Sequence, residues 1–175
     1  MKTAVLATLA VSFMLLGIAP PPPPPETRRC DVALNVTDKD PAGLNVRGDA
    51  SATAPVLTAL KPQGEWIQVH VTGQQGAWYR IDRAVAVTDE EDSGERVLFE
   101  GTGWVHGGKV GDVDLNPGAK VFGDLDKPPF LIAPLDGAAP PFTVIGCMDR
   151  YLLIDINGRA GFTDGYCANQ RTTCS

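Results

Sequence analysis

Long stretches without glycine or proline are scarce in this chain of 175 residues. It contains 19 Gly and 15 Pro, and after residue 40 few segments free of both are long enough for a helix. Both residues disfavour helix interiors, whereas they favour turns between short strands. The composition therefore predicts an all-β protein.

Basic charge is also sparse. The formal net charge is −6, and the longest run of Lys or Arg is Arg28-Arg29. A basic surface for nucleic acid or anionic lipid is missing, and an acidic balance keeps an exported domain soluble. We expect no nucleic-acid partner.

Patterns that bind metals or carry catalytic groups are weak. No C-x-x-C pair occurs, and the two histidines, His70 and His106, lie far from every cysteine in the sequence. The x-D-x-D pairs at 112–114 and 124–126 could bind calcium, but neither has the glycine and terminal glutamate of a calcium loop. We expect no metal, no cofactor and no catalytic residue, with structural or solvated roles for both histidines.

The first residues are typical of an export signal. Lys2 precedes an apolar stretch that ends in Gly17 and Ala19, small residues at the spacing that signal peptidase requires. We predict a signal peptide over 1–19. Cleavage after Ala19 would leave Pro20 as the first residue, a poor peptidase substrate, so an uncleaved membrane anchor is the alternative. Either way we expect the rest of the chain to be periplasmic or secreted, with a membrane tether only if this segment stays uncleaved.

Six consecutive prolines, at 20–25, follow this signal. Such a run adopts an extended polyproline II conformation, which suits a linker over 20–29. The alternative is that the run itself is a ligand for an SH3-type partner, because aromatic grooves bind such runs.

Four cysteines remain in the exported part: Cys30, Cys147, Cys167 and Cys174. An even number in an oxidising compartment predicts two disulfides, with three possible connectivities. We favour Cys167 with Cys174, and Cys30 with Cys147 as a clamp between two domains. The alternative pairs Cys147 with Cys167 or Cys174.

Alternating apolar residues predict short strands. In the segment 66–71, Ile67, Val69 and Val71 lie on one face, opposite Trp66, Gln68 and His70. The turn residues at 73–76 then lead into 77–81, which completes a hairpin. An acidic loop at 89–95 precedes further strands at 97–99 and 103–106.

A second, weaker copy of this order follows residue 108. Strands are expected at 119–122, 142–146 and 151–156, and Asn157-Gly158 is a strong signal for a two-residue hairpin turn. Gly161-Phe162 then takes the place of Gly103-Trp104. We expect domains at 30–110 and 117–175, a duplication of one small unit.

Several of these segments resemble a known family. Leu44-Asn45-Val46-Arg47, Trp78-Tyr79 and Gly103-Trp104-Val105 resemble the bacterial SH3 (SH3b) pattern, which opens with L-N-V-R and closes with G-W-V. The C-x-N-x-x-T-T-C ending at 167–174 is similar to that of small exported SH3-domain proteins of Gram-negative bacteria. The second copy lacks L-N-V-R and has Phe162 in place of the closing Trp.

The resemblance implies two SH3-like, partly open β-barrels in tandem, which the disulfides stabilise. It implies binding of peptidoglycan, or of a peptide or protein of the cell envelope, without catalysis. The alternatives are a structural or inhibitory protein that acts by protein–protein contact and, less favoured, an accessory to a cell-wall hydrolase.

Trp78, Tyr79 and Trp104 are the candidate ligand-binding residues, because aromatic side chains at the rim of a small barrel can dock peptides or sugars. The alternative is that they fill the core. Adjacent residues of a strand point to opposite faces, so at most one of Trp78 and Tyr79 can face outward.

Overall fold

The computed structural model describes residues 26–87, 95–136 and 138–168. Strands make up the regular structure of these residues, apart from one short 3-10 turn, η1 (Gly107–Lys109). The all-β prediction is confirmed. None of the helical structure in the described ranges is long and apolar enough to cross a membrane. The predicted signal at 1–19 and the proline run at 20–25 lie outside these ranges.

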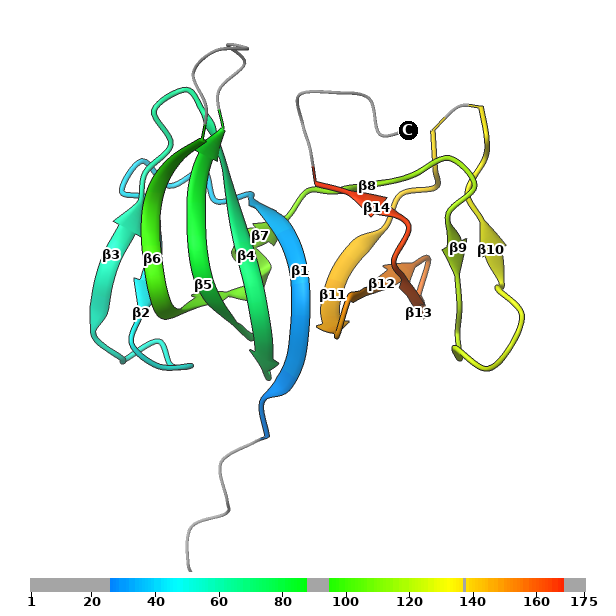
Figure 1. Ribbon diagram of the computed structural model, residues 1–175, viewed down its shortest axis with the longest axis horizontal. Helices are drawn as coiled ribbons and strands as arrows, with labels where there is room; N and C mark the ends of the chain where they lie inside the picture. The colour runs from blue at the N-terminus through cyan, green and yellow to red at the C-terminus, as the bar shows by residue number, and fades with distance from the viewer. Residues whose placement is uncertain (1–25, 88–94, 137, 169–175) are drawn as a thin grey trace, which may run out of the picture.

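The first module is one curled, open antiparallel sheet that forms a half-barrel (Figure 1). Its seven strands lie in the order β3-β2-β6-β5-β4-β1-β7, and all pair antiparallel. The strands are β1 (Arg28–Val36), β2 (Leu44–Arg47), β3 (Val56–Leu60), β4 (Trp66–Gln75), β5 (Trp78–Val87), β6 (Glu95–His106) and β7 (Val110–Gly111).

The concave face of this sheet carries the core. Ile67, Val69 and Val71 of β4 are all buried, with at most 2% of their surface exposed, whereas Trp66 is 39% exposed. The alternation predicted for 66–71 is therefore confirmed. Buried residues of the neighbouring strands, among them Leu34 and Ile81, join the same cluster.

The second module covers residues 114–167 and contains three smaller sheets. Its strands are β8 (Asp114–Leu115), β9 (Lys120–Val121), β10 (Leu131–Ile132), β11 (Thr143–Met148), β12 (Tyr151–Ile156), β13 (Arg159–Thr163) and β14 (Tyr166–Cys167). The order β11-β12-β13 is a meander, as β4-β5-β6 is in the first module. Leu152 and Ile154 of β12 are completely buried at its centre.

The turn between β12 and β13 confirms the hairpin predicted there. Asn157 and Gly158 both have positive φ, at 54° and 81°, which a two-residue turn of type I′ requires. The SH3-like identity of the two modules stays a prediction.

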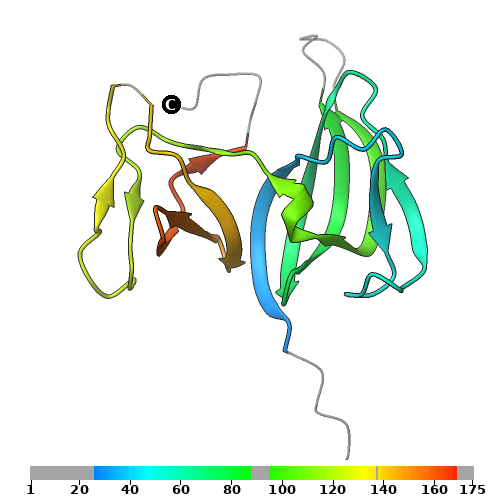
Figure 2. The same ribbon diagram turned by 180° about the vertical axis from the view of Figure 1, so that it is seen from behind.

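β1 joins the two modules. It lies beside β11 in both views (Figures 1 and 2), and an isolated bridge pairs Cys30 with Asp149. The backbone N–H of Asp31 donates to the carbonyl of Asp149 over 2.7 Å, and that of Asp149 donates to the carbonyl of Arg29 over 2.9 Å. A few backbone contacts of this kind align the edge of the first sheet with the start of the second module.

A disulfide reinforces this junction. Cys30 is bonded to Cys147 across 117 residues of sequence, with both side chains buried. The favoured pairing of these two residues is confirmed, and the alternative partners of Cys147 are excluded. No described cysteine is a free thiol. The other predicted pair includes Cys174, which lies outside the described residues.

Candidate functional site

The three aromatic residues singled out in the sequence do not share one face of the sheet. Trp78 pairs with His106, Tyr79 with Val105, and Arg80 with Trp104, so Tyr79 lies on the face opposite both tryptophans. Tyr79 is 2% exposed and belongs to the core, and burial raises its pKa to about 12 although nearby Arg28 lowers it. Tyr79 therefore has no surface to offer a ligand.

The two tryptophans lie on the convex face. Trp78 is half-buried, and its ring meets that of His106 edge-on, with 5.3 Å between the centroids. Trp104 is only 8% exposed and lies between Arg47 of β2 and Arg80 of β5, its cross-strand neighbours. Trp104 packs as part of the sheet, and the structure forms no groove from the three residues together.

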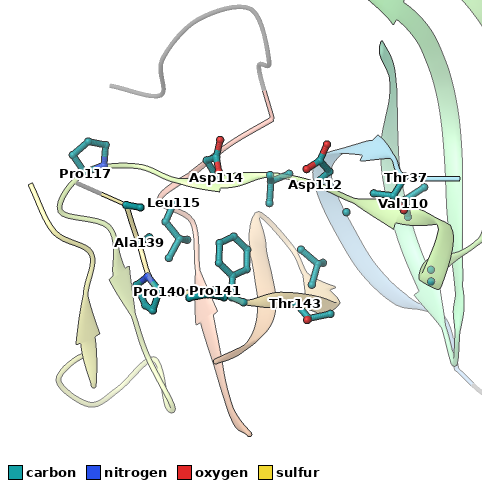
Figure 3. Close-up of a pocket in the computed structure, with 17 residues that line it drawn as sticks. Thr37, Val110, Asp112, Asp114, Leu115, Pro117, Ala139, Pro140, Pro141 and Thr143 are labelled. Atoms are coloured by element: carbon teal, nitrogen blue, oxygen red, sulfur yellow. The ribbon is translucent and has the colours of Figure 1, made fainter. Parts of the chain in front are cut away.

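A groove of about 740 Å³ instead lies where the two modules meet (Figure 3). One wall is the end of the first module, from η1 through β7, and the connecting segment 112–117. The other wall is the proline-containing loop 138–142 and the first residues of β11. Its volume is within the range of small-molecule and cofactor sites in proteins.

Burial alternates strictly along the connecting segment. Val113 and Leu115 are 8% and 7% exposed and form the floor of the groove, whereas Asp112 and Asp114 are exposed. An extended chain sends successive side chains to opposite sides, which accounts for this pattern. In Figure 3, the carboxylates of Asp112 and Asp114 point away from Pro140 and Pro141. Val113 and Leu115 therefore face the groove, whereas the two carboxylates lie on the other side of the segment.

Asn35 of β1 fixes the position of this segment. Its side-chain amide donates to the carbonyl of Asp112 over 2.7 Å and to the carbonyl of Ala168 over 3.1 Å, and the residue is 3% exposed. Gln68 donates a further hydrogen bond of 3.0 Å to the Ala168 carbonyl. Because a buried amide without partners is costly, Asn35 requires both segments to stay in place.

The sequence analysis did not single out Asn35. The signal that could have found it is its position in a segment of alternating apolar residues, where a polar side chain needs partners from elsewhere in the chain.

Few side chains in the lining of the groove are polar. Its charged residues are Asp112 and Asp114, and Pro140 and Pro141 have a carbonyl but no N–H. Side-chain donors come from two threonines of the lining, Thr37 and Thr143.

His70, predicted to be solvated, bridges two carboxylates on the outer face of the first sheet. Its Nδ1 lies 2.7 Å from Asp82 and its Nε2 2.9 Å from Asp31. Burial lowers the pKa of His70, but the hydrogen bonds to Asp31 and Asp82 outweigh it and raise the pKa above the ordinary value. Both ring nitrogens are occupied, so neither can take a proton from a substrate in this arrangement.

Irregular strand pairing builds this cluster. The register shifts between Arg29 and Val32 in β1, directly after His70 in β4, and between Ile81 and Arg83 in β5. A β-bulge re-aims a side chain, and here three strands carry one beside the same histidine. Across the described ranges, no three residues among His, Cys, Asp and Glu are placed to bind a metal ion together.

Comparison with known proteins identifies no relative of this chain. No protein-family model, curated protein or solved structure matches it. The geometry of the groove and the resemblance in the sequence are therefore the basis of the functional argument.

Proposed function

We propose that this chain is an exported, non-catalytic binding protein of the bacterial cell envelope, built from two SH3-like modules, whose ligand lies in the groove between them. The observation that carries this proposal is the groove of about 740 Å³ itself, with the buried side chains of Val113 and Leu115 as its apolar floor. The partner is peptidoglycan or a peptide or protein of the envelope.

The rigid junction favours a binding role for the groove. The Cys30–Cys147 disulfide anchors β11, whose first residues belong to one wall, and Asn35 holds the Asp112 carbonyl in the other wall. A preformed site loses less conformational entropy when a ligand binds than a mobile one does. A binding protein gains affinity from such a junction.

Export is supported by the disulfide together with the predicted signal. Disulfides persist in oxidising compartments such as the periplasm and the extracellular space. The Cys30–Cys147 bond therefore agrees with a periplasmic or secreted protein.

A variant that fills the groove tests the proposal. Thr143 is an exposed strand residue of the groove, and Thr102 is an exposed strand residue of β6 outside it. Purified peptidoglycan sacculi are incubated with the wild type, T143W and T102W, and the retained protein is measured. We expect retention of the wild type and of T102W, and loss of T143W.

To test for protein partners, the same three proteins are immobilised and exposed to a solubilised envelope fraction. Each captured protein is identified, purified and then titrated directly against the three proteins. Equal binding of T143W and T102W to every partner would contradict a ligand site in the groove. Far-ultraviolet circular dichroism and thermal unfolding verify that both variants are folded.

A further inference from the structure

We infer that the groove binds an extended peptide segment as an added β-strand, which pairs through its main chain with the edge of β11 that faces the first module. This inference rests on the proposed function and names the ligand class of the same site. The open part of that edge, and its continuity with contacts that already cover the rest of the edge, carry the inference.

β11 is a terminal strand of its three-stranded sheet, and the first module covers the C-terminal part of its outer edge. The Cys147 N–H donates to Gln74 Oε1 over 3.1 Å. Just beyond the strand, the Asp149 N–H donates to the Arg29 carbonyl over 2.9 Å. Groups of the first module therefore already occupy, from Cys147 onward, the positions that a paired strand would take.

A β-bulge separates this covered part of β11 from its first residues. The register against β12 shifts between Val144 and Gly146, and a bulge bends the strand that carries it. In Figures 1 and 2, β11 lies closest to β1 at its C-terminal end and diverges from it toward its first residues. The groove lies where the two strands have separated.

The first residues of β11 present an open edge to the groove. Thr143 and Val144 line it, and within the described ranges no hydrogen bond joins their backbone to the first module or to the segment 112–117. The N–H and C=O groups of successive strand residues point to opposite sides, so one of these two residues directs its groups away from β12. An unpaired edge of this kind is a template for another strand, and an extended peptide can supply it.

The rest of the lining suits an extended main chain. Gly107, Gly111 and Ala139 are small, so a peptide backbone can approach them closely. Val113 and Leu115 are buried side chains of the floor, and every second side chain of an added strand would point to one face. The floor therefore favours aliphatic residues at alternate positions of the ligand. A glycan strand has no regular row of N–H and C=O groups to pair with β11.

The test uses peptides that differ only in their backbone. The parent is a heptapeptide in which valine and threonine alternate between two terminal lysines, with both ends blocked. One derivative is N-methylated on its valines and the other on its threonines, so each lacks the N–H groups of one strand edge. Binding to the full exported chain is followed by NMR chemical shifts. We expect one derivative to bind at least about tenfold more weakly than the parent, and the other to bind within about threefold of it.

Hydrogen exchange locates the pairing on the protein. An N–H group of Thr143 or Val144 that faces the groove should exchange more slowly when the parent peptide is bound, because the peptide then accepts its hydrogen bond. The T143W variant should lose binding of the parent peptide, whereas the matched control T102W should bind it as the wild type does.

The outcomes separate the inference from the proposed function. Equal effects of the two N-methylations, or unchanged exchange at both Thr143 and Val144, would overturn strand addition. If T143W loses retention on sacculi but the parent peptide does not bind the wild type, the inference fails and the proposed function stands, with a glycan strand as the ligand. If T143W changes no binding at all, the proposed groove fails.

Discussion

The side chain of Gln74 in β4 occupies the backbone edge of β11 beside Cys147. Its Oε1 accepts a hydrogen bond of 3.1 Å from the Cys147 N–H, and its Nε2 lies 3.5 Å from the carbonyl of Ile145. A side chain of the first module thus substitutes for the strand that would otherwise pair with β11. Together with the disulfide of the same Cys147, Gln74 holds the second module against the first.

Replacing Gln74 with alanine should weaken this junction. The buried Cys147 N–H would lose its acceptor, and a buried group left without a partner costs about 1–3 kcal/mol. We expect Q74A to lower the free energy of unfolding by that amount in urea denaturation, and to speed hydrogen exchange at Cys147. The neighbouring Q75A is the control, and an equal loss of stability in both variants would contradict a specific role for Gln74.

Glycine at position 146 leaves room for the Gln74 side chain, which any larger residue would displace. A Cβ atom there would lie 2.8 Å from Gln74 Oε1, closer than such atoms approach in proteins. The same close approach explains why β11 carries a glycine opposite the side chain that caps its edge.

Removal of the disulfide should be more costly than loss of Gln74. Cys30 and Cys147 close a loop with a sequence separation of 117, and in the chain-entropy model a loop of this length stabilises a protein by about 4–5 kcal/mol. We expect the double variant C30A/C147A to lose stability on this scale in urea denaturation. A loss below about 1 kcal/mol would mean that the noncovalent contacts alone fix the modules.

His70 gives the stability a defined dependence on pH. Its pKa is raised in the folded protein, so folding favours the protonated imidazole, which binds Asp31 and Asp82. This contribution is complete below the unfolded pKa, about 6.5, and is lost as the pH rises through the folded value. We expect H70Q to lose more stability relative to the wild type at pH 5.5 than at pH 8.5.

The direction of that difference is the decisive observation, because the exposure of His70 makes its size small. NMR titration of the His70 ring would give the folded pKa directly. A stability difference that grows from pH 5.5 to pH 8.5, or a folded pKa below that of the unfolded chain, would contradict the bridge between the carboxylates.

Tyr79 and Trp78 should respond differently to truncation although they are adjacent. Tyr79 is 2% exposed, and removal of a buried aromatic ring costs about 3–5 kcal/mol, so Y79A should be strongly destabilised in thermal and urea unfolding. Trp78 is half-buried, and W78A should lose much less stability. A folded Y79A with near wild-type stability would contradict the placement of Tyr79 in the core.

Much of the fold could be predicted because its signals are local. The alternation of buried and exposed side chains in 66–71 depends only on residues adjacent in the sequence. The turn at Asn157-Gly158 depends only on the ability of these two residues to adopt positive φ. The even number of cysteines predicted disulfides but left three connectivities open, and the structure bears out the favoured pairing of Cys30 with Cys147.

The candidate site could not be predicted, because it depends on contacts between distant segments. His70 meets carboxylates 39 and 12 residues away only because three strands shift register beside it. The Asn35 side chain donates a hydrogen bond to the carbonyl of Asp112, which lies 77 residues later in the chain. Trp78, Tyr79 and Trp104 were predicted to bind a ligand because they are aromatic. The groove instead consists mainly of small, proline and aliphatic residues, which form no recognisable binding motif in the sequence.

The measurement that tests the central claim most directly is a map of backbone amide chemical shifts as a ligand is added to the exported chain. The ligand is a mixture of soluble muropeptides, which is added stepwise. If the groove is the binding site, the largest changes should lie at Val113, Leu115, Thr143 and Val144, which line it. Changes centred on the convex face around Trp78 and His106, with none in the groove, would contradict the account.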